Sequence, residues 1–182
     1  MNTIKLHDLH FKPFIKEDEI NDIVQRLAQQ IEEDCKGEIP LFIGILNGSF
    51  MFVSDFVKSY KSDCEISFVK LASYQGTSST EKVKQLLGIN ENLEGRTVVI
   101  LEDIIDTGNT LQEIYNIFED KKVKQLKIAT LFFKPDVFKK ELPIDYIGKS
   151  IPDKFIVGYG LDYNGLGRNY PAIYQLTTQQ QK

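Results

Sequence analysis

The sequence contains little cysteine, and what it has is scattered. Only Cys35 and Cys64 occur among its 182 residues, and they do not form a CxxC pair. Isolated cysteines are typical of a reducing compartment, where they act as small hydrophobic residues. The sequence therefore gives no reason to expect a disulfide framework or a thiolate metal site.

The chain also lacks an excess of basic residues. It has 22 Lys and Arg against 26 Asp and Glu, a formal net charge of -4. Such a chain cannot neutralise a nucleic-acid backbone by counterion release, so we expect no nucleic-acid partner. A small phosphorylated ligand stays compatible, because local donors and a bound metal can hold phosphate whatever the overall charge.

Long apolar runs are missing as well. No segment approaches the roughly 18 apolar residues that span a membrane, and the first residues lack a basic segment followed by an apolar run. We therefore expect a cytoplasmic protein without a membrane partner. A hydrophobic content of 42% in 182 residues is enough for one core, so we expect a single domain over residues 1–182.

Strands and helices alternate along most of the chain. Apolar residues at helical spacing follow the acidic residues 17–19, and short apolar runs over 40–46, 65–72, 96–101 and 127–133 predict strands. Further helices are predicted over 50–60 and from 111 to 118. This order predicts an α/β fold with a mainly parallel sheet covered by helices on both faces.

A polar segment without periodicity, SYQGTSSTEKVK, occupies residues 73–84. Loops of about a dozen structureless residues are uncommon in compact domains and often close over active sites. We interpret this segment as a mobile lid, with a disordered hairpin connection as the alternative.

The most informative segment is VVILEDIIDTGNT, residues 98–110, in which a strand leads through a loop into a helix. In open α/β sheets, ligands bind beyond the carboxyl ends of the strands, and this run places its polar residues there. Gly108 permits a close backbone approach, while Thr107, Asn109 and Thr110 supply hydroxyls, an amide and free N–H groups suited to a phosphate.

Three carboxylates, those of Glu102, Asp103 and Asp106, directly precede this phosphate cradle. They would repel a phosphate unless they served a sugar diol, a divalent cation or a transferable proton. The alternative is that Thr107 merely caps the next helix and the acids favour its positive end, which explains only part of the set.

Two other phosphate-binding motifs, the P-loop and GxGxxG, are incomplete in this sequence. Gly148, Lys149 and Ser150 match the end of a P-loop, but Pro143 stands where its first glycine is required, and no complete GxGxxG occurs.

The run LEDIIDTGNTL resembles the signature of type I phosphoribosyltransferases, particularly their 6-oxopurine salvage branch, the hypoxanthine (guanine) phosphoribosyltransferases. Four further segments occur in the family's order: LNGSF, LASY, KIATLFFK and IPDKFIVGYGLDYNGLGR. The resemblance implies a type I phosphoribosyltransferase fold, a twisted sheet with a small hood built from the N- and C-terminal segments and a mobile lid over about 73–84. It also implies Mg2+ as cofactor and a homodimer or homotetramer.

The resemblance further implies a reaction. The phosphoribosyl group of phosphoribosyl pyrophosphate would be transferred to hypoxanthine, and to guanine, giving IMP or GMP and pyrophosphate. Glu102 and Asp103 would hold the ribose hydroxyls directly or through metal, and Asp106 to Thr110 (Asp106, Thr107, Gly108, Asn109, Thr110) the 5'-phosphate. Asp106 would also be the catalytic base for the purine N7 proton.

The remaining roles follow in the same way. Lys134 would contact the 6-oxo group, Phe155 would stack on the purine, and the Ile156 backbone would meet its edge. Asp162 would bind magnesium beside the purine, and Arg168 would contact the pyrophosphate. The lid residues Ser73 and Tyr74 would exclude water.

Asn47 departs from the pattern, because many members have lysine or arginine there, but Gly48 and the main-chain amides still provide a pyrophosphate loop. A regulator that keeps the fold and senses nucleotide or phosphoribosyl pyrophosphate is the alternative function. The acidic net charge and the intact set of Asp106, Lys134, Asp162 and Arg168 argue against it. An adenine or orotate enzyme is a third possibility, and Lys134 with Phe155 disfavours adenine.

Overall fold

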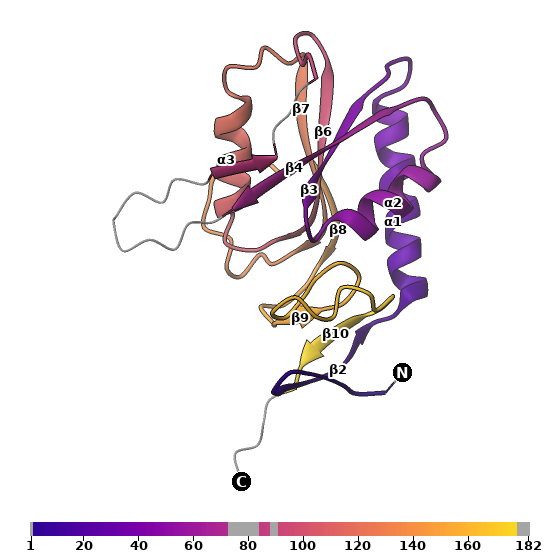
Figure 1. Cartoon of the computed structure of the whole chain (residues 1–182). Coiled ribbons are helices and arrows are strands. Elements are labelled where there is room, and N and C mark those ends of the chain that lie inside the picture. The colour runs from indigo at the N-terminus through magenta and orange to yellow at the C-terminus, as the bar shows by residue number, and fades with distance from the viewer. Residues whose placement is uncertain (1, 73–83, 88–90, 178–182) are drawn as a thin grey trace.

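The chain folds around two β-sheets of different size (Figure 1). The computed structural model describes residues 2–72, 84–87 and 91–177. The larger sheet has the order β5-β4-β3-β6-β7-β8. Its strands are β3 (Leu41–Leu46), β4 (Glu65–Ala72), β5 (Lys84–Leu87), β6 (Thr97–Ile105), β7 (Gln125–Phe133) and β8 (Tyr146–Ser150).

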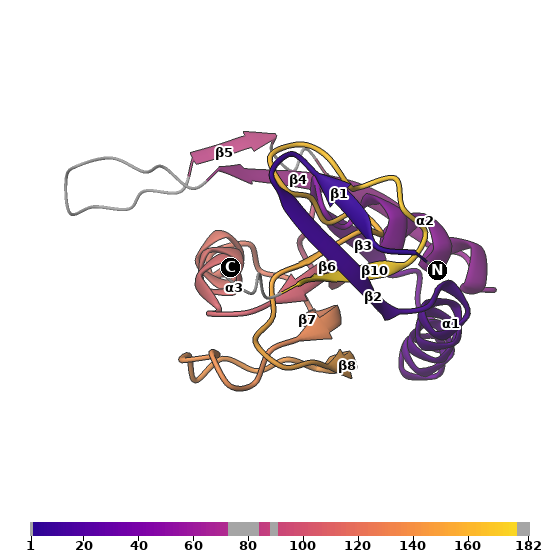
Figure 2. The same ribbon diagram turned by 90° about the horizontal axis from the view of Figure 1, so that it is seen from below.

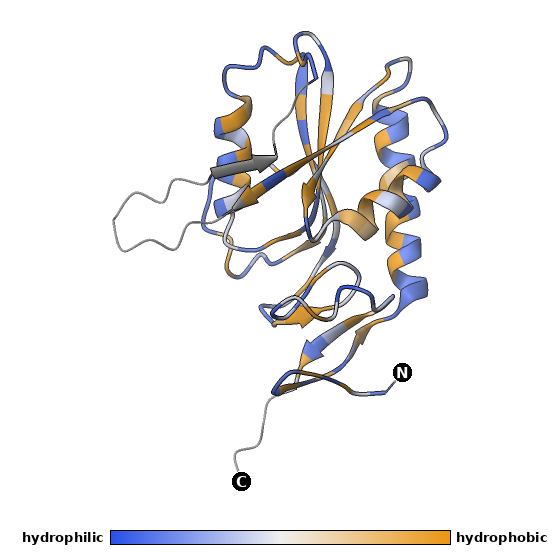
Figure 3. Cartoon of the chain, viewed as in Figure 1, coloured by the Kyte–Doolittle hydropathy of each residue, from blue (hydrophilic) through white to orange (hydrophobic). Residues whose placement is uncertain are grey.

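Five of these strands are parallel, and β5 alone in this sheet pairs antiparallel, with β4. The mainly parallel α/β sheet predicted from the sequence is therefore confirmed. The central strand β3 is buried from Leu41 to Ile45, as expected for a strand covered on both faces. In Figure 3 the strands at the middle of this sheet are correspondingly hydrophobic.

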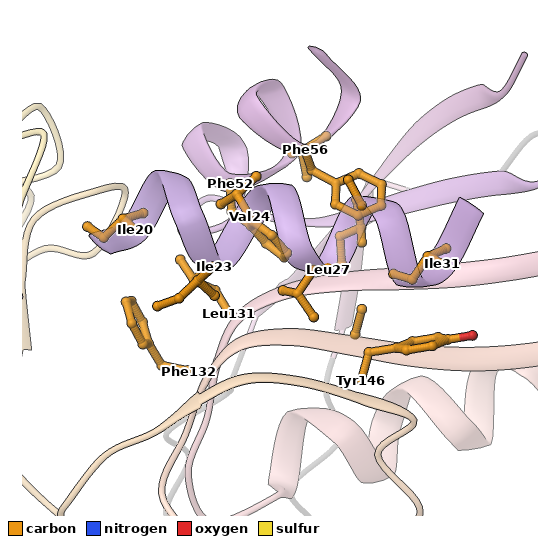
Figure 4. Packing of buried hydrophobic residues seen from close by; sticks show 14 of the residues in the cluster. Ile20, Ile23, Val24, Leu27, Ile31, Phe52, Phe56, Leu131, Phe132 and Tyr146 are labelled. Atoms are coloured by element: carbon orange, nitrogen blue, oxygen red, sulfur yellow. The ribbon is translucent and has the colours of Figure 1, made fainter. Parts of the chain in front are cut away.

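Helices cover both faces of the sheet. The helices α1 (Glu17–Asp34) and α2 (Phe50–Ser59) lie on one face, and α3 (Asn109–Phe118) lies on the other (Figure 2). The helix α1 buries the apolar row that its sequence predicts, consisting of Ile20, Ile23, Val24, Leu27, Ala28 and Ile31. Figure 4 shows this row facing Leu131, Phe132 and Tyr146, with Phe52 and Phe56 of α2 beside it.

The smaller sheet combines segments from both ends of the chain. Its strands, in the order β1-β2-β10-β9, are β1 (Ile4–Leu6), β2 (Leu9–Ile15), β10 (Ile173–Leu176) and β9 (Ile156–Val157). All of its pairings are antiparallel. It has a core of its own, formed by Leu6, Phe11, Val157, Ala172 and Tyr174. We call this sheet the hood.

Several boundaries differ from those predicted. The strand β6 continues to Ile105 instead of ending at Leu101, because it pairs in register with β7 as far as Phe133. The short strand β5 was not predicted. Residues 73–83, which include Ser73 and Tyr74, lie outside the described residues. Cys35 and Cys64 are free thiols, and none of the described helices is long and apolar enough to cross a membrane.

Candidate active site

The two adjacent acids Glu102 and Asp103 lie inside strand β6, close to its carboxyl end, and not in the loop beyond it. The prediction that they follow the carboxyl end of the strand is therefore wrong, although they lie close to that end. Successive side chains of a strand point to opposite faces, so the two carboxylates diverge. Both residues are buried, with 6% and 8% of their surface exposed.

Asp103 packs directly on the loop between β3 and α2. A Cβ atom added to Gly48 would overlap Asp103 Oδ2 and lie 2.6 Å from its Cγ, so only glycine leaves room for this carboxylate. Asp103 Oδ1 accepts a hydrogen bond of 3.0 Å from the Ile104 N–H. The Leu46–Asn47 peptide that precedes Gly48 is cis, and the Asn47 side chain is exposed.

The segment that follows β9 completes this cluster. A Cβ atom on Gly160 would overlap the Gly48 carbonyl oxygen, which places Gly160 against the same loop. Arg168 Nη1 donates to the Gly160 carbonyl oxygen at 2.6 Å, and its Nη2 lies 2.6 Å from Asp162 Oδ1. Desolvation raises the pKa of Asp103 to about 6, against the opposing effects of backbone hydrogen bonds to its carboxylate and, to a smaller extent, of the Arg168 charge. The loop after β3, strand β6 and the segment after β9 thus meet in one place.

Glu102 is the most unusual group of the site. Its Oε2 atom is buried and has no hydrogen-bond partner among the described residues. Burial, reinforced by the charges of Asp103 and Asp106, raises the pKa of Glu102 well above its ordinary value. A buried carboxylate without a partner is costly, so this atom is suited to a bound cation or hydroxyl.

The loop after β6 forms the start of helix α3. Gly108 occupies the N-cap position with φ +84°, in the left-handed region, and no side chain caps the helix. The alternative in which Thr107 caps α3 is therefore wrong. Thr107, Asn109 and Thr110 are exposed, and the first N–H groups of α3 have no cap. Such N–H groups at a helix start are a ready anion site.

Asp106 lies at the entrance of this loop. Its Oδ1 atom accepts a 2.5 Å hydrogen bond from the Thr107 backbone N–H, and the residue is exposed. Of the predicted site residues, Asp106 and the phosphate loop are contiguous with Glu102 and Asp103.

Of the predicted base-binding residues, Lys134 follows β7, whereas Phe155 directly precedes β9 and Ile156 is its first residue. The backbone N–H of Lys134 donates to the Ile105 carbonyl oxygen at 2.9 Å, directly before Asp106. Phe155 is 44% exposed although aromatic, and its ring meets Tyr163 edge-on with centroids 5.8 Å apart. Ile156 is buried in β9. Lys134 also forms an ion pair with Asp153, a residue that the sequence reasoning did not single out.

The described residues contain no group of three Asp, Glu, His or Cys side chains arranged to hold a metal ion. Glu102, Asp103 and Asp162 therefore do not form a complete cage made by the protein. Mg2+ usually keeps several waters and is bound through one or two carboxylates together with substrate phosphates, so this arrangement suits a substrate-borne ion.

The family to which these features point is shown by known proteins. A family model described as "Phosphoribosyl transferase domain" matches residues 16–164. The chain therefore belongs to the phosphoribosyltransferase family, as its motifs predict.

Its relatives specify the branch. The chain is 41% identical over 160 residues to a hypoxanthine-guanine phosphoribosyltransferase of Staphylococcus aureus, covering 87% of this chain and 89% of that protein. The crystal structure of a Bacillus anthracis hypoxanthine-guanine phosphoribosyltransferase has a TM-score of 0.86 and 41% identity, over 91% of this chain and 98% of that one. A Trypanosoma cruzi hypoxanthine phosphoribosyltransferase has a TM-score of 0.86 at 30% identity, over 96% and 95%. The resemblance noted in the sequence is confirmed.

Proposed function

We propose that this chain transfers the 5-phosphoribosyl group of phosphoribosyl pyrophosphate to hypoxanthine, and also to guanine, in purine salvage. The products are IMP or GMP and pyrophosphate. One observation carries the proposal: two buried carboxylates, Glu102 and Asp103, lie near the end of strand β6, which leads directly into an uncapped helix start at Gly108. The two carboxylates suit the ribose hydroxyls, and the helix start suits the 5'-phosphate of the same ligand.

The sugar phosphate would be held from two sides. Thr107 to Thr110 (Thr107, Gly108, Asn109, Thr110) offer hydroxyl and backbone N–H groups to the phosphate at the positive end of α3. Glu102 and Asp103 would accept hydrogen bonds from the two ribose hydroxyls. The unpartnered Glu102 Oε2 supports this role, since a hydroxyl donor would relieve its burial.

The same carboxylates fit a magnesium ion. Glu102, Asp103 and Asp162 are the candidate protein ligands, and the high pKa of the buried Glu102 reflects a site that a cation would stabilise. When bound with phosphoribosyl pyrophosphate, magnesium would neutralise part of the charge on the leaving pyrophosphate. Few protein ligands are needed, because substrate phosphates and water supply the other oxygen ligands of a magnesium ion.

The base would lie between the hood and the end of β7. The exposed face of Phe155 would stack on the purine, the Ile156 backbone would meet its edge, and the Lys134 ammonium would donate to the 6-oxo oxygen. As N9 of hypoxanthine bonds to the ribose carbon, the N7 proton would pass to Asp106. Asp106 thereby serves as general base as well as part of the phosphate loop.

The pyrophosphate would leave on the opposite side of the ribose. Arg168 lies near the Gly48 loop and supplies a permanent positive charge for the departing group. Asn47 and Gly48 would contribute main-chain contacts. The sugar gains positive charge as the bond to pyrophosphate breaks, so exclusion of water by Ser73 and Tyr74 of the lid is also part of the proposal.

The direct test is a product assay with phosphoribosyl pyrophosphate, magnesium and each purine in turn. We expect IMP from hypoxanthine, GMP from guanine and no AMP from adenine. Absence of product with every purine would contradict the proposal and favour a nucleotide sensor, which no specific observation supports at present. The same assay after chelation of magnesium tests the cofactor, and full activity without divalent cations would contradict that part.

We also propose that the protein works in the cytoplasm as a homodimer or homotetramer. Sedimentation equilibrium of the purified chain would test the assembly, and a monomer at micromolar concentration would contradict it.

A further inference from the structure

The ion pair between Lys134 and Asp153 links the two walls of the proposed base site. Lys134 Nζ donates to Asp153 Oδ1 at 3.0 Å. The Lys134 side chain is only 10% exposed, whereas that of Asp153 is 56% exposed. Lys134 is thus fixed at both ends, since its backbone N–H also donates to the Ile105 carbonyl oxygen.

Asp153 belongs to the segment that carries the stacking ring. It lies between β8 and β9, two residues before Phe155. This segment is anchored on both sides, because the Ile151 N–H donates to the Phe133 carbonyl oxygen at 2.8 Å and the Leu176 N–H donates to the Phe155 carbonyl oxygen at 2.9 Å. The position of Asp153 is therefore defined relative to Phe155 and to the end of β7.

The hydrogen-bonding capacity of the Lys134 ammonium determines which purine it can bind. A lysine ammonium has three N–H donors and no acceptor, so one bond to Asp153 leaves two donors for a ligand. A 6-oxo oxygen accepts such a bond, whereas the 6-amino group of adenine presents donors in the same place. A long flexible side chain discriminates between them only if its head is held in position.

We propose that Asp153 is a positioning residue for base selection, which holds the Lys134 ammonium beside Phe155 so that it donates to the 6-oxo oxygen of the purine. The inference rests on the proposed function. The competing explanation is an ion pair at the rim of the site that adds little, as most exposed pairs do.

The test is Asp153→Asn, which keeps the size of the side chain and removes its charge. Calorimetric titration would measure the binding of IMP, AMP and ribose 5-phosphate. We expect IMP to bind about tenfold more weakly, the scale of one hydrogen bond to a charged group, and AMP and ribose 5-phosphate to bind as before. In turnover, KM for hypoxanthine should rise while KM for phosphoribosyl pyrophosphate stays constant.

Asp136→Asn is the matched control. Asp136 is exposed, lies two residues after Lys134 and pairs with no cation in the described part of the chain. The Asp136→Asn substitution also removes one negative charge near Lys134 in the chain. It should leave the affinities for IMP, AMP and ribose 5-phosphate unchanged. Asp153→Glu keeps the carboxylate and should restore part of the IMP affinity.

A double-mutant cycle with Lys134→Met identifies the route of the effect. If Asp153 acts through Lys134, Asp153→Asn has no further effect on IMP binding once Lys134 is replaced. Equal IMP affinity in Asp153→Asn and Asp136→Asn, an equal loss for ribose 5-phosphate, or additive effects in the cycle would overturn the inference. Failure of the wild-type chain to make IMP would instead overturn the proposed function.

Discussion

Replacement of Gly48 by alanine tests the closest approach in the site. The Cα of Gly48 faces the carboxylate of Asp103, and a methyl group there would lie 2.6 Å from Asp103 Cγ and overlap Oδ2. Real Cβ contacts essentially never fall below 3.0 Å. The carboxylate must therefore shift by about 1 Å, a displacement that can lower catalysis about 10²-fold.

We accordingly expect Gly48→Ala to lower kcat/KM for phosphoribosyl pyrophosphate by about 10²-fold. The fold should survive, because overpacking at one position typically costs about 1–3 kcal/mol. Steady-state kinetics with varied phosphoribosyl pyrophosphate measures the first quantity, and urea unfolding measures the second.

Gly95→Ala is the control, a destabilising change away from the site. A Cβ on Gly95 meets nothing within 4 Å, but φ is +73°, so alanine is strained by about 1 kcal/mol without touching the site. This variant should lose stability and keep its kinetics. If Gly48→Ala retained kcat/KM within about threefold, a change too small for a displaced carboxylate, the reasoning about the Gly48–Asp103 contact would be refuted.

Three further changes have defined outcomes. Asp106→Ala should lower turnover by about 10²- to 10⁴-fold with the circular dichroism spectrum intact, and unchanged turnover would remove its role as base. Asn47→Lys should tighten pyrophosphate binding several-fold in calorimetry, by roughly the worth of one surface ionic contact, and no change would make charge at this position unimportant. Tyr159→Phe removes the 2.7 Å bond from its hydroxyl to Asp55 Oδ2 and should lower the free energy of unfolding by about 1 kcal/mol, which an unchanged urea midpoint would contradict.

The helices and inner strands were predictable because the residues that the apolar spacing assigns to the core are the residues that the fold buries. The apolar row of α1 has the period of a helix and is buried as that period requires. The parallel pairing of β3 with β4 and of β6 with β7 follows from the helices α2 and α3 that connect them. The helix start after β6 was predictable for the same reason, since Gly108 and its neighbours have residue types that are typical of a helix start.

The end of β6 was not predictable from composition. A strand predicted from hydrophobicity ends at its first charged residue, because burial of a carboxylate without a partner is unfavourable. The protein buries Glu102 and Asp103 nevertheless, and the cost is consistent with a ligand that supplies their partners. Local rules of this kind are most often violated at functional sites.

Contacts between distant segments were equally inaccessible. In the sequence, Asp153 is one of several charged residues between strands, and only the fold places it against Lys134. Likewise, the need for glycine at position 160 follows only from its contact with the Gly48 carbonyl oxygen. The pairing of β2 with β10 joins residues that the sequence separates by most of its length, and only the family resemblance, which implies a hood of N- and C-terminal segments, indicated it. No pattern within either segment contains this information.

The construction of the hood has a consequence for the order in which the protein matures. The strands that bear the sugar-phosphate residues lie in the middle of the chain, whereas the carbonyl of Phe155 is held by Leu176, on a strand that itself pairs with β2. The larger sheet is built from strands that all precede residues 173–176 and does not include them, so it can form without β10. The platform that we propose for the purine is completed only when β10 is inserted between β2 and β9.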